Sequence, residues 1–496
     1  MLCVVTGASG YIGGRLVPQL LNAGHRVRCV VRNPNKLRDV PWREQVEVVS
    51  ADLLNADSLE PALKGGDVLY YLVHSLSTSG FAEVDRRAAT NTAEAANAAG
   101  IGRIIYLGGL HPDEPGELSK HLGSRAEVGE ILMRSGVPTI VLQAAVIIGS
   151  GSASFEMLRY LTERLPVMVT PRWVRNRVQP LAVRDVLHYL VRAIDLPGEL
   201  NRSFDIGGPE ILTYAEMMHR YARVAGLPRR RMLPVGVLSP KLSSHWINIV
   251  TPVPRRIGAP LIESLIHEAV CSENDIATYI DEPEGGLTGY DEAVRLALVK
   301  TRNAAVETRW SDASPAEAPS DPLPSDPQWA GGSAYTDVRE RETAVPPTGV
   351  WPVIEGIGGP KGWYSFPLAW AARGWADRLI GGVGLRRGRR DADRLRVGEA
   401  LDWWRVEELE EGHLLRLRAE MKVPGLAWLE LSVEPRSGGG SVYRQRAIFV
   451  PRGLAGHVYW WAVAPFHGLV FGGMARNIVR AAEHGERPAA TDHRRH

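Results

Sequence analysis

The chain has little cysteine and almost no excess charge. Only three of its 496 residues are Cys, and Cys3, Cys29 and Cys271 lack the close spacing of a metal site or a disulfide framework. They predict buried thiols in a reducing compartment. A formal net charge of +2 gives no general attraction to nucleic acid or to membranes. Met1 runs directly into LCVVTG without a basic leader, so we expect a cytoplasmic protein.

Long apolar runs and concentrated basic runs are also scarce. Residues 453–474 (GLAGHVYWWAVAPFHGLVFGGM) have spanning length and no Lys or Arg, but they include two His and a Pro. We predict a buried C-terminal helix there, with a membrane-surface element in peripheral contact through 453–474, or a membrane span, as the alternatives. The basic run at 385–396 is interrupted by Asp391 and Asp393, which favours a solvated face, and we expect no nucleic-acid partner.

Short apolar runs alternate with helical patterns over the first 150 residues. The runs are rich in β-branched residues and nearly continuous in apolarity, as parallel strands buried on both faces require. The predicted strands are 2–6, 26–31, 46–50, 68–73, 103–108 and 139–144. Between the first two, Ile12, Leu16 and Leu20 have helical spacing, and Gly24 is a plausible helix end. The alternation predicts an α/β fold with a Rossmann-type, doubly wound parallel sheet.

Composition divides the rest of the chain. Residues 151–305 mix helical and strand patterns and are expected to complete the fold with a small substrate subdomain. Residues 306–334 are rich in Pro, Ser and Asp, which is the composition of a linker. Nine of the fourteen Trp follow residue 350, and alternating segments at 413–421, 427–435 and 441–450 predict strands of an α+β domain over 335–482. Residues 483–496 are expected to form a disordered tail.

The segment TGASGYIGG places three glycines directly after the first strand and before the first helix. Gly7 allows the tight turn, Gly10 lets the backbone approach a pyrophosphate, and Gly13 permits close packing of helix on strand. The helix N-terminus then offers free N–H groups and partial positive charge to the phosphates. We therefore predict a dinucleotide site, with the 1–150 segment as an NAD(P)-binding domain.

The end of the second strand indicates which dinucleotide is bound. Arg32 follows the strand where NAD-binding proteins usually carry an acid, and its guanidinium suits a 2′-phosphate, so NADP is favoured over NAD. Asp52 is either an adenine contact or a turn residue, with Leu53 beside it. The complete set of predicted cofactor-binding residues is Gly7, Ser9, Gly10, Tyr11, Ile12, Gly13, Arg32, Asp52, Leu53 and Leu72.

The motifs TGASGYIGG, ADLLNADSL, NTAEAANAAG and QPLAVRDV resemble the atypical, extended branch of the short-chain dehydrogenase/reductase superfamily, and HLGSRAEVGEIL resembles its NmrA-like members. The resemblance covers about residues 1–290. It implies a Tyr general acid/base, a Lys four residues later and a strand-end Ser. No Tyr in this chain has a Lys four residues later, and Gly108 and Gly109 stand where the Ser is expected.

His121 and Arg125 keep the spacing of the missing Tyr and Lys. On a helix both can face one nicotinamide, and His can act as a general acid, so they are the predicted catalytic pair. The alternative is that both are structural polar residues beside a cleft. His74 is a further catalytic candidate, although a structural strand-end histidine is the commoner case. Asn91 resembles the family's helix Asn, which implies support of the active-site backbone, and an exposed helix Asn is the alternative. Asp185 is interpreted as structural.

The segments RGWADRLIGGVGLRRGRRD, LDWWRVEEL and YWWAVAPFHGLVFGGM resemble a bacterial domain of unknown function, of the helix-grip (START-like, SRPBCC) class. That resemblance implies a cavity for a small apolar ligand. Together the two resemblances imply an NADP-dependent oxidoreductase acting on an apolar carbonyl or quinone-like substrate. The alternative is a non-catalytic NADP-binding regulator or assembly factor, similar to the accessory subunit of respiratory complex I, with a ligand-binding C-terminal domain.

Overall fold

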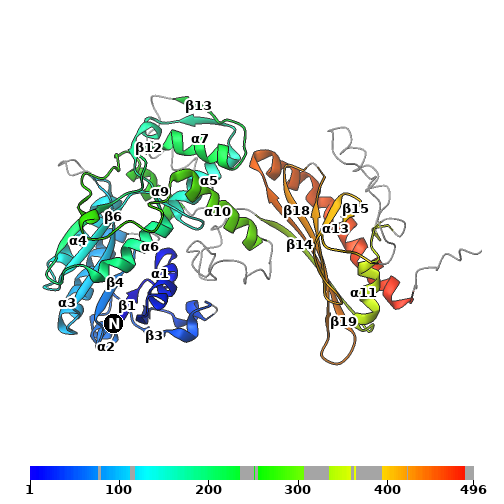
Figure 1. Ribbon diagram of the computed structural model, residues 1–496, viewed down its shortest axis with the longest axis horizontal. Coiled ribbons are helices and arrows are strands. Elements are labelled where there is room, and N and C mark those ends of the chain that lie inside the picture. The colour runs from blue at the N-terminus through cyan, green and yellow to red at the C-terminus, as the bar shows by residue number, and fades with distance from the viewer. Residues whose placement is uncertain are drawn as a thin grey trace, which may run out of the picture. The chain divides into compact units, whose positions relative to one another are not determined.

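The computed structural model describes residues 1–38, 40–75, 80–111, 118–234, 251, 255–305, 334–358, 362–364, 394–421 and 423–485. The chain divides into two compact units, with the boundary between Gly332 and Ser333 (Figure 1). The predicted linker is almost entirely outside the described residues, as are the basic run up to residue 393 and the tail after residue 485.

Among the described residues, seven parallel strands of the N-terminal unit form one sheet in the order β11-β6-β5-β4-β1-β2-β3. They are β1 (Leu2–Thr6), β2 (Arg26–Val31), β3 (Glu47–Ser50), β4 (Val68–Tyr71), β5 (Arg103–Gly109), β6 (Thr139–Ala144) and β11 (Arg202–Ile206). Every residue of β1 and β4 is buried, which explains their continuous apolar sequences. The six predicted strands and the doubly wound fold are confirmed. The strand order reverses beside β1, and dinucleotides bind at such a reversal in open α/β sheets.

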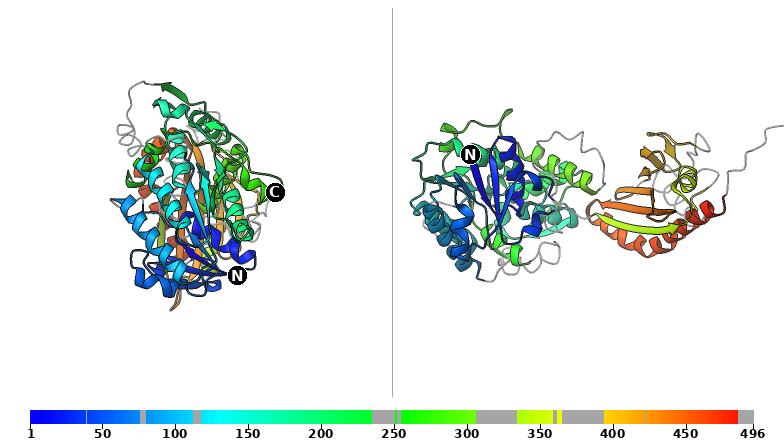
Figure 2. Two further views of the ribbon diagram at one scale, coloured as in Figure 1. Left: turned by 90° about the vertical axis from the view of Figure 1, so that its left-hand side faces the viewer. Right: turned by 90° about the horizontal axis from the view of Figure 1, so that it is seen from below.

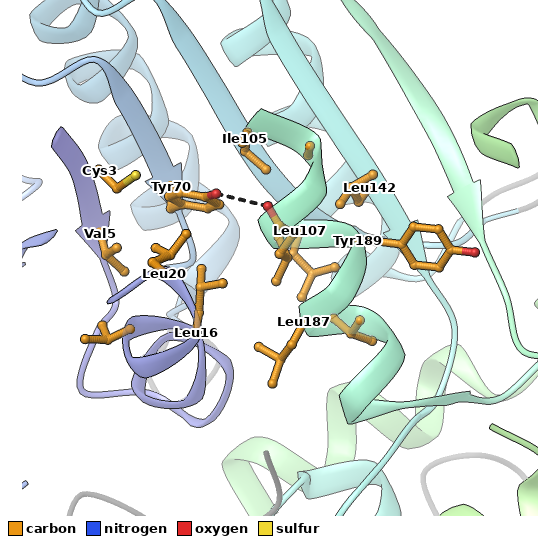
Figure 3. Packing of buried hydrophobic residues seen from close by; sticks show 14 of the residues in the cluster. Cys3, Val5, Leu16, Leu20, Tyr70, Ile105, Leu107, Leu142, Leu187 and Tyr189 are labelled. Carbon is orange, nitrogen blue, oxygen red and sulfur yellow. Dashed lines mark hydrogen bonds between the residues drawn. The ribbon is translucent and has the colours of Figure 1, made fainter. Parts of the chain in front are cut away.

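Helices cover both faces of this sheet. On one face lie α1 (Tyr11–Asn22) and α6 (Val183–Arg192), and on the other lie α2 (Leu59–Leu63), α3 (Phe81–Ala98) and α4 (Lys120–Met133). Leu16 and Leu20 of α1 and Leu187 of α6 pack on the sheet, as Figure 3 shows. The buried Tyr70 hydroxyl donates a hydrogen bond to the Leu190 carbonyl at 3.0 Å, so the sheet and α6 are joined by a polar contact within an apolar core.

A second core of the N-terminal unit lies beyond the carboxyl ends of the strands. Its helices are α5 (Ala153–Arg164), α7 (Tyr214–Val224), α9 (Arg255–Ser264) and α10 (Tyr290–Ala305). Its short strand pairs are β7 (Ile147–Ile148) with β10 (Leu181–Ala182), β8 (Val167–Thr170) with β13 (Arg231–Pro234), and β9 (Arg177–Val178) with β12 (Leu212–Thr213). Asp185 on α6 is fully buried and accepts hydrogen bonds from the Thr288 backbone N–H and hydroxyl, at 2.8 and 3.1 Å, in agreement with its structural interpretation.

The described part of the C-terminal unit is an antiparallel sheet with helices packed on it. The strand order is β14-β19-β18-β17-β16-β15. The strands are β14 (Tyr335–Thr343), β15 (Ala400–Leu401), β16 (Trp404–Glu410), β17 (Leu414–Ala419), β18 (Gly425–Pro435) and β19 (Ser441–Pro451), and the helices are α11 (Pro347–Glu355) and α13 (Gly453–Glu483). Figure 2 shows α13 lying along the sheet, and the three alternating segments predicted as strands are confirmed as β17, β18 and β19.

Helix α13 is buried on one side only, which corrects the prediction of a buried helix at 453–474. Phe471, Met474, Ala475 and Ile478 belong to the buried core of the unit. Four apolar side chains lie exposed on the same helix, at 45, 60, 68 and 63% of their surface: Leu454, Val458, Trp461 and Phe466. The prediction failed because residues 453–475 contain no Asp, Glu, Lys or Arg to mark a solvent side. No helix among the described residues is both long and apolar enough to cross a membrane.

Candidate functional site

The glycine turn between β1 and α1 is built for a close approach of backbone to backbone. Gly7 has φ +79°, and a Cβ there would lie 2.5 Å from the Leu72 carbonyl oxygen at the end of β4. A Cβ on Gly13 would lie 2.3 Å from the Gly7 carbonyl oxygen, so only glycine lets α1 start this close to the turn. The predicted roles of Gly7 and Gly13, and the position of Leu72 beside the turn, agree with this geometry.

The N-terminus of α1 is open to an anion. Gly10 is the N-cap residue, is exposed and has no side chain to cap the helix, and the first turn carries no acidic residue. A Cβ added to Gly10 would approach the Gly7 carbonyl oxygen at 3.2 Å. Apart from Gly10 and its two neighbours in the chain, no other atom of the described residues would lie within 4 Å of it, so the space beside Gly10 is open. Free N–H groups and the positive end of the helix dipole are therefore presented beyond the carboxyl end of β1. This donor set fits a pyrophosphate.

The neighbouring residues of the predicted set lie at the same edge. Ser9, Tyr11 and Ile12 are half-buried around the turn, and the Arg15 guanidinium lies 4.1 Å from the centroid of the Tyr11 ring. A Cβ on Gly149 would lie 2.2 Å from the Tyr11 hydroxyl, so the loop after β7 closes on this ring. Tyr11 is therefore held between its own helix and the second core.

Arg32, Asp52 and Leu53 follow the carboxyl ends of β2 and β3. Arg32 is exposed at the end of β2. The Asp52 carboxylate accepts a hydrogen bond from the Leu54 backbone N–H at 3.1 Å. This contact is typical of a turn residue, which was one of the two interpretations of Asp52 from the sequence. Leu53 is buried, and its carbonyl accepts a hydrogen bond from the Asn91 amide at 2.9 Å. The Asn91 side chain thus supports the backbone after β3.

His121 lies in a polar cluster that joins four segments. Ser119 caps α4 by accepting the Leu122 N–H, and His121 follows in the first turn. The His121 Nδ1 lies 2.9 Å from the Ser264 hydroxyl of α9, and the His121 ring stacks on the His74 ring with centroids 5.3 Å apart. His74 follows β4, and its Nδ1 lies 3.2 Å from the Asp85 carboxylate of α3. The cluster therefore brings together residues that are far apart in the sequence.

The pKa values in this cluster are set by burial. Burial, together with electrostatic interactions with Arg125 and His74, lowers the pKa of His121 to about 2. His121 is therefore neutral at physiological pH, unlike the near-neutral titration expected from its residue type. Burial also lowers the pKa of His74, although its hydrogen bond to Asp85 opposes the shift. Burial raises the pKa of Asp85, but hydrogen bonds from His74 and Ser75 outweigh it and leave the pKa below its usual value.

An ionised Asp85 fixes the tautomer of His74. The carboxylate can only accept a hydrogen bond, so the His74 proton lies on Nδ1 and Nε2 is left as an acceptor. This Nε2 atom is buried and has no partner among the described residues. His74 was one of the sequence candidates, whereas Asp85 and Ser264 were missed.

The Arg125 side chain of α4 contacts a different element, β5. Its guanidinium donates to the Leu107 carbonyl at 2.8 Å and lies 5.7 Å from the centroid of the Tyr106 ring. A Cβ on Gly109 would lie 3.8 Å from the Arg125 Nε, which is ordinary van der Waals contact, so the arginine lies beside the strand end where a Ser was expected. His121 and Arg125 share a helix but have separate partners, and their use as a catalytic pair stays a prediction.

The C-terminal unit has a separate cavity of about 390 Å³ between its sheet and α13. Apolar and aromatic side chains line it, among them Trp404, Trp428 and Phe449 from the sheet and Trp460, Phe466 and Phe471 from α13. One imidazole also lines the cavity. The His467 ring meets the Trp460 and Phe471 rings edge-on, and its Nδ1 lies 3.8 Å from the Asp337 carboxylate. The cavity thus offers an apolar interior with one polar corner.

Comparison with known proteins places the N-terminal unit. The family described as NAD(P)H-binding matches residues 7–143. The chain is 32% identical over 276 residues to a protein of Caulobacter vibrioides named ceramide reductase, and the match covers 53% of this chain and 83% of that protein. The chain belongs to the NAD(P)H-binding, NmrA-like short-chain dehydrogenases/reductases. The C-terminal unit matches the family described as protein of unknown function (DUF2867) over residues 329–474.

Two further similar proteins share with this chain only a small part of their length or only the fold. An uncharacterized protein of Mycobacterium tuberculosis is 25% identical over 269 residues, which are 54% of this chain but only 26% of that protein. The triphenylmethane reductase of a Citrobacter species, solved with NADP(H), is 22% identical at a TM-score of 0.49, and the match covers 60% of this chain and all of that one.

Proposed function

We propose that this protein is an NADP-dependent reductase of an apolar carbonyl or quinone-like substrate. The observation that carries the proposal is the open N-terminus of α1 above the Gly7–Gly13 turn, at the reversal of the strand order in an NmrA-like unit. When bound, the cofactor supplies a hydride. Tyr11 and Ile12 would hold its pyrophosphate through backbone N–H groups, Gly10, whose own N–H donates to the Gly7 carbonyl, would let the phosphates approach the backbone, and Leu72 would border the central part of the cofactor.

The preference for NADP rests on Arg32. This side chain is exposed directly after β2, where no acid is present to bind ribose hydroxyls. A forked guanidinium binds a 2′-phosphate through charge-assisted hydrogen bonds, each of which contributes roughly 1.5–3 kcal/mol. Loss of Arg32 is therefore expected to weaken NADPH binding by about tenfold or more while NADH binding changes little.

Reduction of a carbonyl also consumes a proton, and the polar cluster supplies the candidates. His121 is the weaker proton carrier, because burial holds its pKa at about 2. His74 is the better one, since its hydrogen bond to the ionised Asp85, 3.2 Å from its Nδ1, opposes the lowering of its pKa by burial. In this proposal His74 exchanges the proton at Nε2, His121 orients the ring by stacking, and Arg125 binds oxygen atoms of the ribose or substrate.

The C-terminal unit is proposed to belong to the helix-grip class and to hold a small apolar ligand. Its antiparallel sheet packed by a long terminal helix, and the aromatic cavity between them, support this proposal. A cavity of about 390 Å³ is within the usual size range of sites for small molecules. The name of the Caulobacter relative adds ceramide and related lipids to the substrates worth testing.

The test measures cofactor binding and turnover in the full chain. NADPH oxidation is followed against carbonyl, quinone and ceramide-type substrates, and NADPH and NADH affinities are titrated separately. Gly10→Val is expected to abolish binding of both cofactors. Arg32→Gln is expected to weaken only NADPH, with Lys36→Gln as the matched control, because Lys36 is also exposed and basic but lies one turn further on. Unchanged NADPH affinity in Arg32→Gln would refute the NADP assignment.

A second candidate is a non-catalytic NADP-binding regulator or assembly factor. It is favoured by one observation: the expected Ser, Tyr and Lys are all absent, because Gly108 and Gly109 stand at the end of β5 and no Tyr has a Lys four residues later. The two candidates differ in turnover. Loss of turnover in His74→Asn and His121→Ala with NADPH affinity retained supports the reductase, whereas tight NADPH binding without oxidation on any substrate supports the regulator.

A further inference from the structure

The exposed side of α13 forms a continuous apolar stripe. Leu454, Val458, Ala462 and Phe466 follow each other at intervals of four, and Trp461 is one helical turn beyond Val458. All five are exposed. Side chains at such intervals share one face of a helix, so the stripe (Leu454, Val458, Trp461, Ala462 and Phe466) runs along the first half of α13. A face of this kind marks an interaction site when it is contiguous.

The stripe leads to the cavity of the same unit. Phe466 lines the cavity and yet leaves 63% of its surface exposed, so it lies at the mouth. From the inner side, Tyr459, Trp460 and Val463 line the cavity on the same stretch of helix. The first half of α13 therefore separates the cavity from the outside: one face of the helix borders the cavity, and the other face carries the apolar stripe.

The composition of the first half of α13 fits a lipid surface. Residues 453–475 carry no Asp, Glu, Lys or Arg, so their insertion into an apolar layer does not require the desolvation of a charged acidic or basic side chain of these types. A Trp at the stripe suits the boundary between acyl chains and water, and the exposed Arg452 directly before the helix suits lipid phosphates. The helix does not meet the requirements of a span, so it would lie in the plane of the surface.

We propose that the C-terminal unit docks on a lipid surface through the stripe of α13 and takes the ligand of its cavity from that surface. The ligand is an amphiphile with an apolar chain and a small polar group. The chain fills the aromatic interior, and the polar group reaches His467, which Asp337 borders at 3.8 Å. The proposal rests on the ligand-binding role of the C-terminal unit and is independent of reduction by the NmrA-like unit.

The first experiment measures sedimentation of the full chain with vesicles of phosphatidylcholine, with and without phosphatidylglycerol. The wild type is expected to bind both, and more tightly with the anionic lipid. Val458→Glu is expected to weaken binding by at least about tenfold, because it places a charge at the centre of the stripe without touching the cavity. Val397→Glu is the matched control: Val397 is 63% exposed in the same unit but lies outside the stripe. This control is expected to bind vesicles like the wild type.

The second experiment separates docking from ligand binding. A fluorescent dodecanoyl probe is titrated in solution without vesicles. Val458→Glu is expected to keep the wild-type affinity for the probe, and Ala427→Phe, which fills the cavity from β18, is expected to lose probe binding and keep vesicle binding. Near-ultraviolet circular dichroism, to which the buried Trp351, Trp363 and Trp403 of the same unit contribute, serves as the folding control in all variants.

Several outcomes would overturn the proposal. Equal vesicle binding by the wild type and Val458→Glu would show that the stripe is not the docking surface. Absence of vesicle binding, together with self-association that Val458→Glu abolishes, would assign the stripe to a second copy of the chain. Absence of both would assign it to an internal contact. Failure of probe binding with intact vesicle binding would refute the cavity ligand alone.

Discussion

The buried His121 predicts a specific loss of stability in mild acid. Its pKa is lowered from the usual 6.5 to about 2 in the folded chain, and the ring is only 9% exposed. The unfolded chain therefore binds a proton at a pH where the folded chain does not. The corresponding stability is fully present above pH 6.5 and is lost as the pH falls below 6.5.

The size of the loss follows from the shift. A pH of 5 lies about 1.5 units below the pKa of the histidine in the unfolded chain. At 1.36 kcal/mol per unit, the free energy of unfolding therefore falls by about 2 kcal/mol. Between pH 7 and pH 5, Asp85 adds nothing, because its lowered pKa affects stability only below its usual 3.8. His74 acts in the same direction as His121, because burial lowers its pKa as well.

The measurement is native-state hydrogen exchange of the β4 and β5 amides in the full chain, at pH 7 and pH 5, for wild type and His121→Gln. Glutamine can keep a hydrogen bond to Ser264 but does not titrate. The wild type is expected to lose about 2 kcal/mol more than the variant between the two pH values. His188→Gln is the control: His188 bonds the Asp281 carbonyl at the surface, and the variant should follow the wild type. An equal pH dependence in wild type and His121→Gln would refute the assignment of His121 as a buried neutral residue.

Three further outcomes are expected. Gly13→Ala should destabilise the N-terminal unit by about 1–3 kcal/mol, because its Cβ would lie 2.3 Å from the Gly7 carbonyl oxygen, and unchanged β1 exchange rates would contradict the packing described. Asp185→Ala should cost about 2 kcal/mol, measured in the same way, since it leaves the buried Thr288 N–H without its acceptor. The three thiols should react slowly with iodoacetamide at pH 8, because burial raises the pKa of each to about 12; fast alkylation of the folded chain would contradict this.

The fold of the N-terminal unit could be predicted because its signals are local. The glycine turn lies within a few residues, and each strand of the first 150 residues is a short apolar run between helical patterns. The seventh strand, β11, was not predicted as part of this sheet. It pairs with β6 across more than fifty intervening residues, and nothing in the SFDI sequence itself specifies that partner.

The polar cluster shows where sequence reasoning stops. His121 and Arg125 were found from their spacing, and His74 from its place after a strand. The contacts of His121 with Ser264, and of His74 with Asp85, depend on how α3, α4 and α9 pack, which spacing does not encode. Residue type also predicted a titrating histidine, whereas burial, a property of the assembled fold, keeps it neutral.

The pairing of β14 with β19 has a consequence for the order of synthesis and folding. β14 is the first described strand of the C-terminal unit and β19 the last, and they pair over nine residue positions from Tyr335–Phe449 to Thr343–Ser441. β14 leaves the ribosome long before its partner exists. It is an edge strand, and charged residues at 337 and 339–342 along it discourage pairing with other chains during that interval. A nascent chain truncated before residue 441 should therefore lack the pairing that joins β14 to the rest of the sheet.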